Sequence, residues 1–287
     1  MQTFQTVVFE AAPGGGNPCP VTLDADALTA EQMQSMTHEF GFESVFLMQS
    51  EREDCDWRAR YFVPLHEMEM CVHATIGSAF VLVQTGRAQR SPIFYETMFG
   101  RIQIDWERDG DEIRVSVHQF EPRFAPRNPT AAEVCACLRI SESDLAPLPI
   151  QSAATSRFKL IVPLRSREVL DGLEPDFEAL WALCDKYETT GFYPFASETD
   201  ADGQLRFFAR QFPKRAGYPE DPATGVAASA LGAYLAEHRV SPLHEGWNRF
   251  VVMQGAAMHR PSMIFSDIEW DGSRVTHTRV TGTARML

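Results

Sequence analysis

Two stretches of the chain, residues 71–82 and residues 219–235, carry the same pattern. Each contains Ala-Thr, then a glycine within two positions, then small and apolar residues at helical spacing. Each also follows an alternating, strand-like run, at residues 57–64 and at residues 204–210. The pattern predicts a loop that opens into a buried helix, and its recurrence about 150 residues later predicts a fold with two similar halves.

The start of each predicted helix is where a ligand is expected to bind. Backbone N–H groups at a helix N-terminus lack partners and carry partial positive charge, so they attract anions. Two similar halves that face each other would direct two such N-termini into one cleft, a suitable place for a carboxylate. Taken singly, each stretch is equally consistent with an ordinary helix start.

Length and charge restrict the class of protein. A chain of 287 residues can form two domains of ordinary size. A formal net charge of −13 without a Lys/Arg cluster argues against nucleic-acid binding. No apolar run approaches the roughly 18 residues that a bilayer span needs, and the N-terminus lacks a signal pattern. We therefore expect a soluble, cytoplasmic protein that binds neither nucleic acid nor membrane.

The sequence shows no motif for a metal, a nucleotide or a disulfide framework. Its six cysteines are scattered, with no CxxC pair and no histidine at zinc spacing. The glycines at residues 14–16 are not followed by Lys-Ser/Thr, which disfavours a phosphate loop. We expect most of the cysteines to be ordinary buried or surface residues. The six are Cys19, Cys55, Cys71, Cys135, Cys137 and Cys184.

The order of predicted elements suggests where the two halves meet. Helices are expected from Thr29 to Phe40, at residues 130–138 and at residues 175–187, with strands between them. A Pro- and Arg-containing segment at residues 121–128 is the best candidate for a boundary. We therefore predict domains at 1–121 and 122–287, with the last strand, about residues 275–287, as a candidate to return to the first half.

Glu43 is unusual because it places a carboxylate at the start of an apolar strand, just after the turn at Gly41. A solvated residue at a strand start is an equally good interpretation of Glu43 alone. Burial there would raise its pKa and suit it to proton transfer near neutral pH.

Five ordered motifs resemble the phenazine-biosynthesis (PhzF-like) isomerase family. They are Gly-Asn-Pro at residues 16–18, Glu43 after the helix from Thr29, His-Ala-Thr-Ile-Gly at residues 73–77, Glu-Asp-Pro-Ala-Thr-Gly at residues 220–225, and Gln254-Gly255 with residues 260–262. The resemblance covers nearly the whole chain. It implies a mixed α/β, diaminopimelate-epimerase-like fold, in which two pseudo-twofold-related halves each wrap a curved, barrel-like sheet around a central helix. It also implies a homodimer that uses no cofactor and no metal.

The resemblance also implies roles for particular residues. Glu43 stands at the position of the family's general acid/base, His73 at its active-site histidine and Asp221 at its active-site aspartate. The remaining residues implied to hold the substrate carboxylate or line its site are Asn17, Ser44, Val72, Thr75, Thr224, Gly225 and Val226. The implied activity is an isomerase that moves a proton on a small cyclic or amino-acid-like carboxylate.

Two alternatives stay open at this point. Cys71 lies where the related epimerases and racemases of this fold carry a catalytic cysteine, and a thiolate at a helix N-terminus has a lowered pKa. The segment around Thr224 offers no second cysteine, which disfavours racemisation by two bases. Val226 replaces a serine that is common in the family, and the missing hydroxyl favours either a different substrate or a catalytically silent carboxylate-binding protein.

Overall fold

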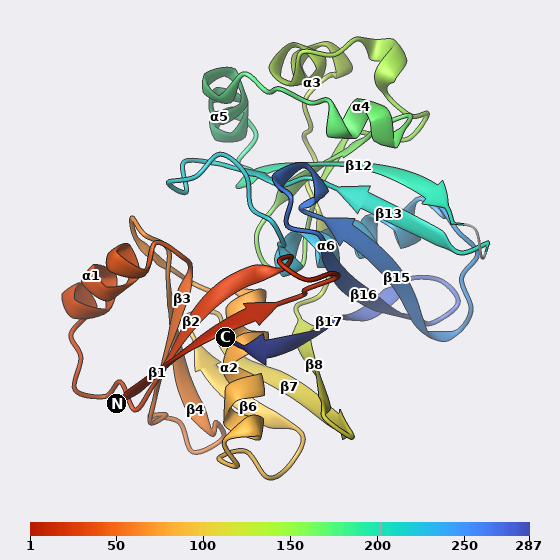
Figure 1. The fold of residues 1–287 in the computed structure, drawn as a ribbon. Helices are drawn as coiled ribbons and strands as arrows, with labels where there is room; N and C mark the ends of the chain where they lie inside the picture. Colours follow the sequence, from red (N-terminus) through yellow and green to blue (C-terminus); the bar gives the residue numbers. More distant parts are fainter. Residues whose placement is uncertain (201–202) are drawn as a thin grey trace.

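The computed structural model describes residues 1–200 and 203–287 and shows two α/β halves (Figure 1). The first half contains β1 (Gln2–Val8), β2 (Asn17–Leu23), α1 (Ala30–Phe40), β3 (Ser44–Met48), β4 (Trp57–Phe62), β5 (Glu67–Met68), α2 (Val72–Gln84), β6 (Ile93–Thr97), β7 (Gly100–Asp109) and β8 (Glu112–Gln119). The second half contains β9 (Arg123–Phe124), α3 (Ala131–Leu138), η1 (Glu142–Asp144), β10 (Gln151–Ala154), β11 (Lys159–Pro163), α4 (Arg167–Asp171), α5 (Phe177–Lys186), β12 (Gly191–Thr199), β13 (Leu205–Ala209), β14 (Phe212–Pro213), α6 (Gly225–Glu237), β15 (Gly246–Gln254), η2 (Ala256–Met258), β16 (Ser262–Trp270) and β17 (Val275–Met286).

The two halves have the same strand connectivity. The first is ordered β1-β2-β3-β4-β6-β7-β8 and the second β10-β11-β12-β13-β15-β16-β17. In each half the second and third of these strands run parallel, as do the fourth and fifth. This shared order confirms the predicted duplication.

The two halves are linked through β17 and through the connection from β8 to β9. β17 pairs with β16 of its own half, where Ser266 faces Val280, and then with β8 of the first half. Its end pairs with β1, where Thr6 faces Met286. In the opposite direction, β9 follows β8 and pairs with β10. Because of these links both sheets close into barrels, and Figure 1 shows β17 running between the halves. The predicted boundary at residues 121 and 122 stays a prediction.

The central helices α2 and α6 are buried on every side. All residues of α2 except Gln84 are buried, and so are all of α6 except Glu237. A helix without a polar face belongs in a core, which is why these two stretches end up inside the barrels. Small residues let the sheets approach closely, since a Cβ added to Gly232 would lie 2.1 Å from Ser266 Oγ.

The outer helices cover the barrels, and α1, α3 and α5 begin close to their predicted positions. Thr29 and Thr130 each close a capping box at the start of α1 and α3. Met33 of α1 packs with Phe46 and Phe62, while α3, α4 and α5 share a second apolar cluster against β11 and β12. The short helix α4 was not predicted. None of the described helices is long and apolar enough to cross a bilayer.

Candidate active site

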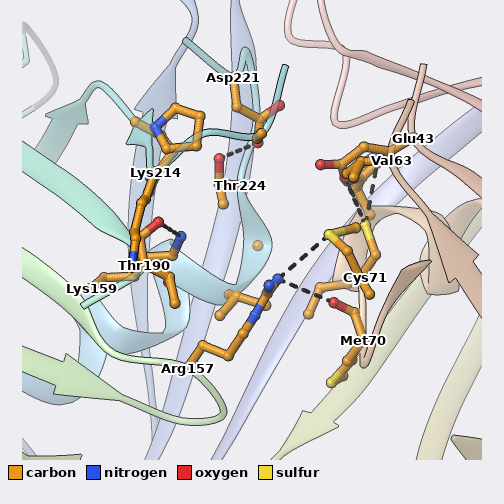
Figure 2. Close-up of a pocket in the computed structure, with 18 of the residues that line it drawn as sticks. Glu43, Val63, Met70, Cys71, Arg157, Lys159, Thr190, Lys214, Asp221 and Thr224 are labelled. Atoms are coloured by element: carbon orange, nitrogen blue, oxygen red, sulfur yellow. Dashed lines mark hydrogen bonds and ion pairs between the residues drawn. The ribbon is translucent and has the colours of Figure 1, made fainter. Parts of the chain in front are cut away.

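A cavity of about 200 Å³ lies where the two halves meet, and we call it the central cavity (Figure 2). Both halves contribute to its wall. The first half contributes Glu43, Cys71, Val72 and His73 to the lining. The second half contributes Arg157, Lys159, Gln211, Lys214, Tyr218, Asp221, Thr224, Gly225 and Val226.

The N-termini of α2 and α6 meet at this cavity. Neither helix has a side-chain cap, and no described residue accepts a hydrogen bond from the N–H groups of the first two residues of either helix. The starts touch each other, because a Cβ added to Gly225 would lie 2.5 Å from Val72 Cγ1. Four unpartnered N–H groups at two converging helix ends favour the binding of an anion there. This arrangement matches the one expected from the repeated pattern.

Glu43 lies beside these helix starts, held by three side chains. Its Oε2 accepts a hydrogen bond from Cys71 Sγ at 3.0 Å and lies 3.4 Å from His73 Nδ1. Cys71 Sγ is in turn 3.1 Å from His73 Nδ1. The hydroxyl of Tyr218 donates a hydrogen bond to Oε1 from the opposite half. The carboxylate is therefore fixed in place before a substrate binds.

The pKa of Glu43 is shifted in the direction opposite to the sequence-based prediction. Burial raises it, as expected, but the charge that His73 can carry and the hydrogen bonds from Tyr218 and Cys71 outweigh burial, so the pKa is lowered. Burial lowers the pKa of His73, with Glu43 opposing the shift. At neutral pH the pair therefore holds a carboxylate and a neutral imidazole, and Glu43 is prepared to accept a proton.

Asp221 is the second carboxyl group of the cavity. Burial and the nearby charge of Glu43 raise its pKa to about 8. Asn17 Nδ2 donates to Asp221 Oδ1 at 2.8 Å, and the hydroxyl of Thr224 donates to Oδ2. Gln254 fixes the same loop, because its Nε2 donates to the Asp221 carbonyl at 2.7 Å. The two carboxyl groups thus carry about one negative charge between them at neutral pH.

The loop that carries Tyr218 and Asp221 is anchored at both ends. Arg210 forms a bidentate ion pair with Glu220, at 2.9 and 2.7 Å. The backbone N–H of Asp221 donates to the Gln211 carbonyl at 3.1 Å. These contacts hold the loop across the cavity toward Glu43.

Most of the predicted site residues are brought together at the central cavity. Glu43, Val72, His73, Thr224, Gly225, Val226 and Asp221 line it, and Cys71 lies among them.

Three of the predicted substrate-binding residues are buried behind this wall. Asn17 supports Asp221, as described above. Thr75 Oγ1 donates to the Cys71 carbonyl at 2.8 Å, and Ser44 Oγ donates to the Phe42 carbonyl at 3.0 Å. These contacts position the neighbours that reach the cavity.

Sequence reasoning missed several polar residues of the wall, including Lys159, Tyr218, Arg157 and Gln211. Lys159 was detectable, because it is the one charged residue in the apolar run at residues 158–162. Tyr218 precedes Asp221 by three positions, but nothing in the sequence directs it toward Glu43. Arg157 and Gln211 carry no local signal.

One group of side chains in the described part of the chain could hold a metal ion. It consists of Glu43, Cys71 and His73, whose ligating atoms lie within 4.8 Å of one another. Those same atoms are hydrogen-bonded to each other at 3.0 and 3.1 Å. The expectation that no metal or cofactor is used stays a prediction.

Comparisons with known proteins agree with this geometry. The sequence profile described as phenazine biosynthesis-like protein (PhzC-PhzF) matches residues 7–287. The chain is 33% identical to an uncharacterized isomerase, YddE, of Escherichia coli K12, over 100% of this chain and 96% of that protein. It is 32% identical to the trans-2,3-dihydro-3-hydroxyanthranilate isomerase of Pseudomonas aeruginosa, over 96% of this chain and 92% of the enzyme.

Solved structures show the same architecture. A phenazine biosynthesis protein of the PhzF family from Bacillus anthracis superposes with a TM-score of 0.88 at 28% identity, over 100% of this chain and 98% of that one. A probable proline racemase from Agrobacterium radiobacter reaches 0.66 at 11% identity, over 99% of this chain and 90% of that one, and shares the fold alone. The predicted epimerase-like fold is confirmed.

Proposed function

The chain belongs to the phenazine biosynthesis-like (PhzC-PhzF) family of isomerases, and from this premise we propose that Glu43 moves a proton between two atoms of a small cyclic or amino-acid-like carboxylate. The observation that carries the proposal is the position of the Glu43 carboxylate beside two converging helix N-termini. The N–H groups hold the substrate carboxylate. Glu43 then faces the carbon framework attached to it.

The lowered pKa of Glu43 sets the order of the proton transfers. Glu43 begins as a carboxylate and removes a proton from one carbon of the bound substrate. The resulting carboxylic acid returns a proton to another position of the same substrate, so that the enzyme ends in its starting state. A single positioned carboxyl group is sufficient for both steps, and no cofactor is required.

Asp221 and His73 complete the acid/base set. With its pKa raised to about 8, Asp221 is largely protonated at neutral pH and offers a proton or a hydrogen bond to a substrate oxygen or nitrogen atom. Neutral His73 orients Glu43 and Cys71 through Nδ1. Val226 gives the wall an apolar surface where the family commonly has a serine, which favours a substrate other than dihydro-hydroxyanthranilate.

A Cys71-dependent racemase is the second candidate, because Cys71 Sγ touches both Glu43 and His73. Two observations count against it. Burial and the Glu43 carboxylate raise the pKa of the thiol, which disfavours the thiolate. Across the cavity the start of α6 presents Thr224, Gly225 and Val226 instead of a second thiol.

Solvent deuterium uptake tests the proposal. A panel of small cyclic and amino-acid carboxylates is incubated with the enzyme in D2O and analysed by NMR and mass spectrometry. Glu43→Gln should reduce deuterium uptake by about a hundred- to ten-thousand-fold while substrate binding persists. The exposed Glu39→Gln serves as the matched control and should exchange at the wild-type rate. Unchanged exchange by Glu43→Gln would refute the role of Glu43. The predicted homodimer and cytoplasmic location stay predictions.

A further inference from the structure

The wall of the central cavity that faces Glu43 contains a lysine with few partners. Lys159 begins β11 and is only 5% exposed. Among the described residues its ammonium group has a single hydrogen-bond acceptor, the Thr190 carbonyl at 3.4 Å. An ammonium group has three donors, so most of its capacity is unused. Figure 2 shows Lys159 and Thr190 across the cavity from Glu43 and Cys71.

Gln211 adds a buried amide without partners to the same wall. Its side chain is 1% exposed, and neither Oε1 nor Nε2 has a hydrogen-bond partner among the described residues. The amide lies against Gly191, where an added Cβ would be 2.5 Å from Nε2. Thr190 immediately precedes Gly191. All three residues, Lys159, Thr190 and Gln211, line the central cavity, and we call this part of its wall the Lys159–Gln211 corner.

Arg157 reinforces the positive charge near this corner. It reaches into the cavity between the two walls in Figure 2, and its Nη2 donates to the Met70 carbonyl at 3.4 Å. Its Nε is buried and has no partner within the described chain. Within residues 1–200 and 203–287 it forms one ion pair, a long one of 3.8 Å to the half-exposed Glu69. Lys214, also on the wall, forms an ion pair with Asp185, a carboxylate that it shares with Arg215.

Buried polar groups are normally satisfied, and unpartnered ones at the edge of a cavity indicate where a ligand supplies the missing bonds. A carboxylate fits the corner, since it accepts from both an ammonium group and an amide N–H. The helix N-termini already provide a separate place for the first carboxylate.

We infer that the Lys159–Gln211 corner, assisted by Arg157, is a second anchoring subsite that binds a second carboxylate group, so the substrate class is a small dicarboxylate. The inference rests on the proposed function, because it assigns the first carboxylate of the substrate to the helix N-termini. The two anchors place the atoms between them beside Glu43. Burial and Arg157 lower the pKa of Lys159 to about 7, although Asp221, Cys184 and Glu43 oppose the shift. Binding of the dianion should therefore draw a proton onto Lys159 and weaken above that pH.

Matched ligands and variants test the subsite by isothermal titration calorimetry. The probe pairs are glutarate with its half-amide glutaramate, and phthalate with its half-amide phthalamate, because each pair differs by one charge at similar shape. We expect the wild type to bind at least one dicarboxylate about tenfold or more tightly than its half-amide. Lys159→Met should reduce this preference to within about twofold, and Gln211→Leu should reduce it in the same direction. The exposed Lys186→Met is the matched control and should keep the full preference.

The outcomes separate the subsite from the proposed function. The inference would be overturned if the wild type prefers neither dicarboxylate over its half-amide. It would also be overturned if Lys159→Met and Gln211→Leu both fold and both keep the wild-type preference. Glu43→Gln should keep the preference, because binding at the corner does not involve proton transfer. If Glu43→Gln leaves exchange intact while the preference is present, the proposed role of Glu43 fails and the subsite stands. If exchange depends on Glu43 but the wild type shows no dicarboxylate preference, the proposed role of Glu43 stands and the subsite fails.

Discussion

The hydroxyl of Tyr218 donates a hydrogen bond to the carboxylate of Glu43, and the two residues come from different halves of the molecule. This contact closes the central cavity on one side and fixes the group that we propose to carry the proton. It also lowers the pKa of Glu43. Tyr218 is therefore expected to influence the protonation state of Glu43 as well as its position.

Tyr218→Phe should shift the acidic limb of the pH–rate profile for deuterium exchange to higher pH. The change removes a hydrogen bond that favours the carboxylate, so the pKa of Glu43 rises and a smaller fraction of it is ionised at acidic pH. A hydrogen bond to a charged group is worth about 1.5–3 kcal/mol, so the acidic limb should move upward by about one to two pH units. Tyr187→Phe, at a hydrogen-bonded tyrosine on the outer face, is the control. Identical profiles for Tyr218→Phe and wild type would contradict the assignment.

Asp221→Asn should change how stability depends on pH. The pKa of Asp221 is 3.8 in a reference peptide and about 8 in the folded protein, so between these values the folded state holds a proton that the unfolded state releases. Wild-type stability relative to Asp221→Asn should therefore fall as the pH rises from about 4 to about 8, by up to about 1.4 kcal/mol per pH unit. Urea denaturation at pH 5 and pH 8 measures this difference. A flat or rising difference for Asp221→Asn would contradict the shift.

Much of the architecture was predictable because local signals and the global fold agree. The runs that begin at Val72 and Gly225 are apolar on every side, so a buried helix was the only good interpretation of them. The capping-type sequence at Thr29 marked the start of α1, and the helix expected from about residue 130 is α3. The ordered motifs then predicted that Glu43 and Asp221 would lie in one cavity, and they do.

The remaining features depend on contacts between segments that lie far apart in the sequence. Tyr218 reaches Glu43 only because the loop before α6 crosses to the other half, a contact without a local signature. Lys159 and Gln211 lie in the same cavity wall because one contacts Thr190 and the other lies against Gly191, at the start of β12. The direction of the Glu43 pKa shift was predicted wrongly, because burial was visible in the sequence pattern and its hydrogen-bond donors were not.

Gly225→Ala should destabilise the protein by pushing the two helix starts apart. The new Cβ would lie 2.5 Å from Val72 Cγ1 and 2.7 Å from Val72 Cβ, and overpacking of this kind costs about 1–3 kcal/mol. Val72→Ala removes the obstructing atom Cγ1, so the double variant should recover part of the loss. Urea denaturation of both single variants and the double variant measures the coupling. Strictly additive effects would contradict the close contact.

Cys71→Ala separates the two catalytic hypotheses. In the Glu43 mechanism Cys71 only donates a hydrogen bond to Glu43 Oε2, at 3.0 Å, so its loss should raise the pKa of Glu43 and slow deuterium exchange by no more than about tenfold. Cys71→Ser, which keeps a donor, should lie closer to wild type. In the racemase mechanism Cys71→Ala would abolish exchange, while Glu43→Gln would have only a mild effect on it.

Alkylation of Cys71 gives a second test of the two hypotheses. Because burial raises the pKa of the thiol, the free enzyme should resist iodoacetamide at neutral pH. Rapid inactivation by alkylation of Cys71 would instead favour a reactive thiolate.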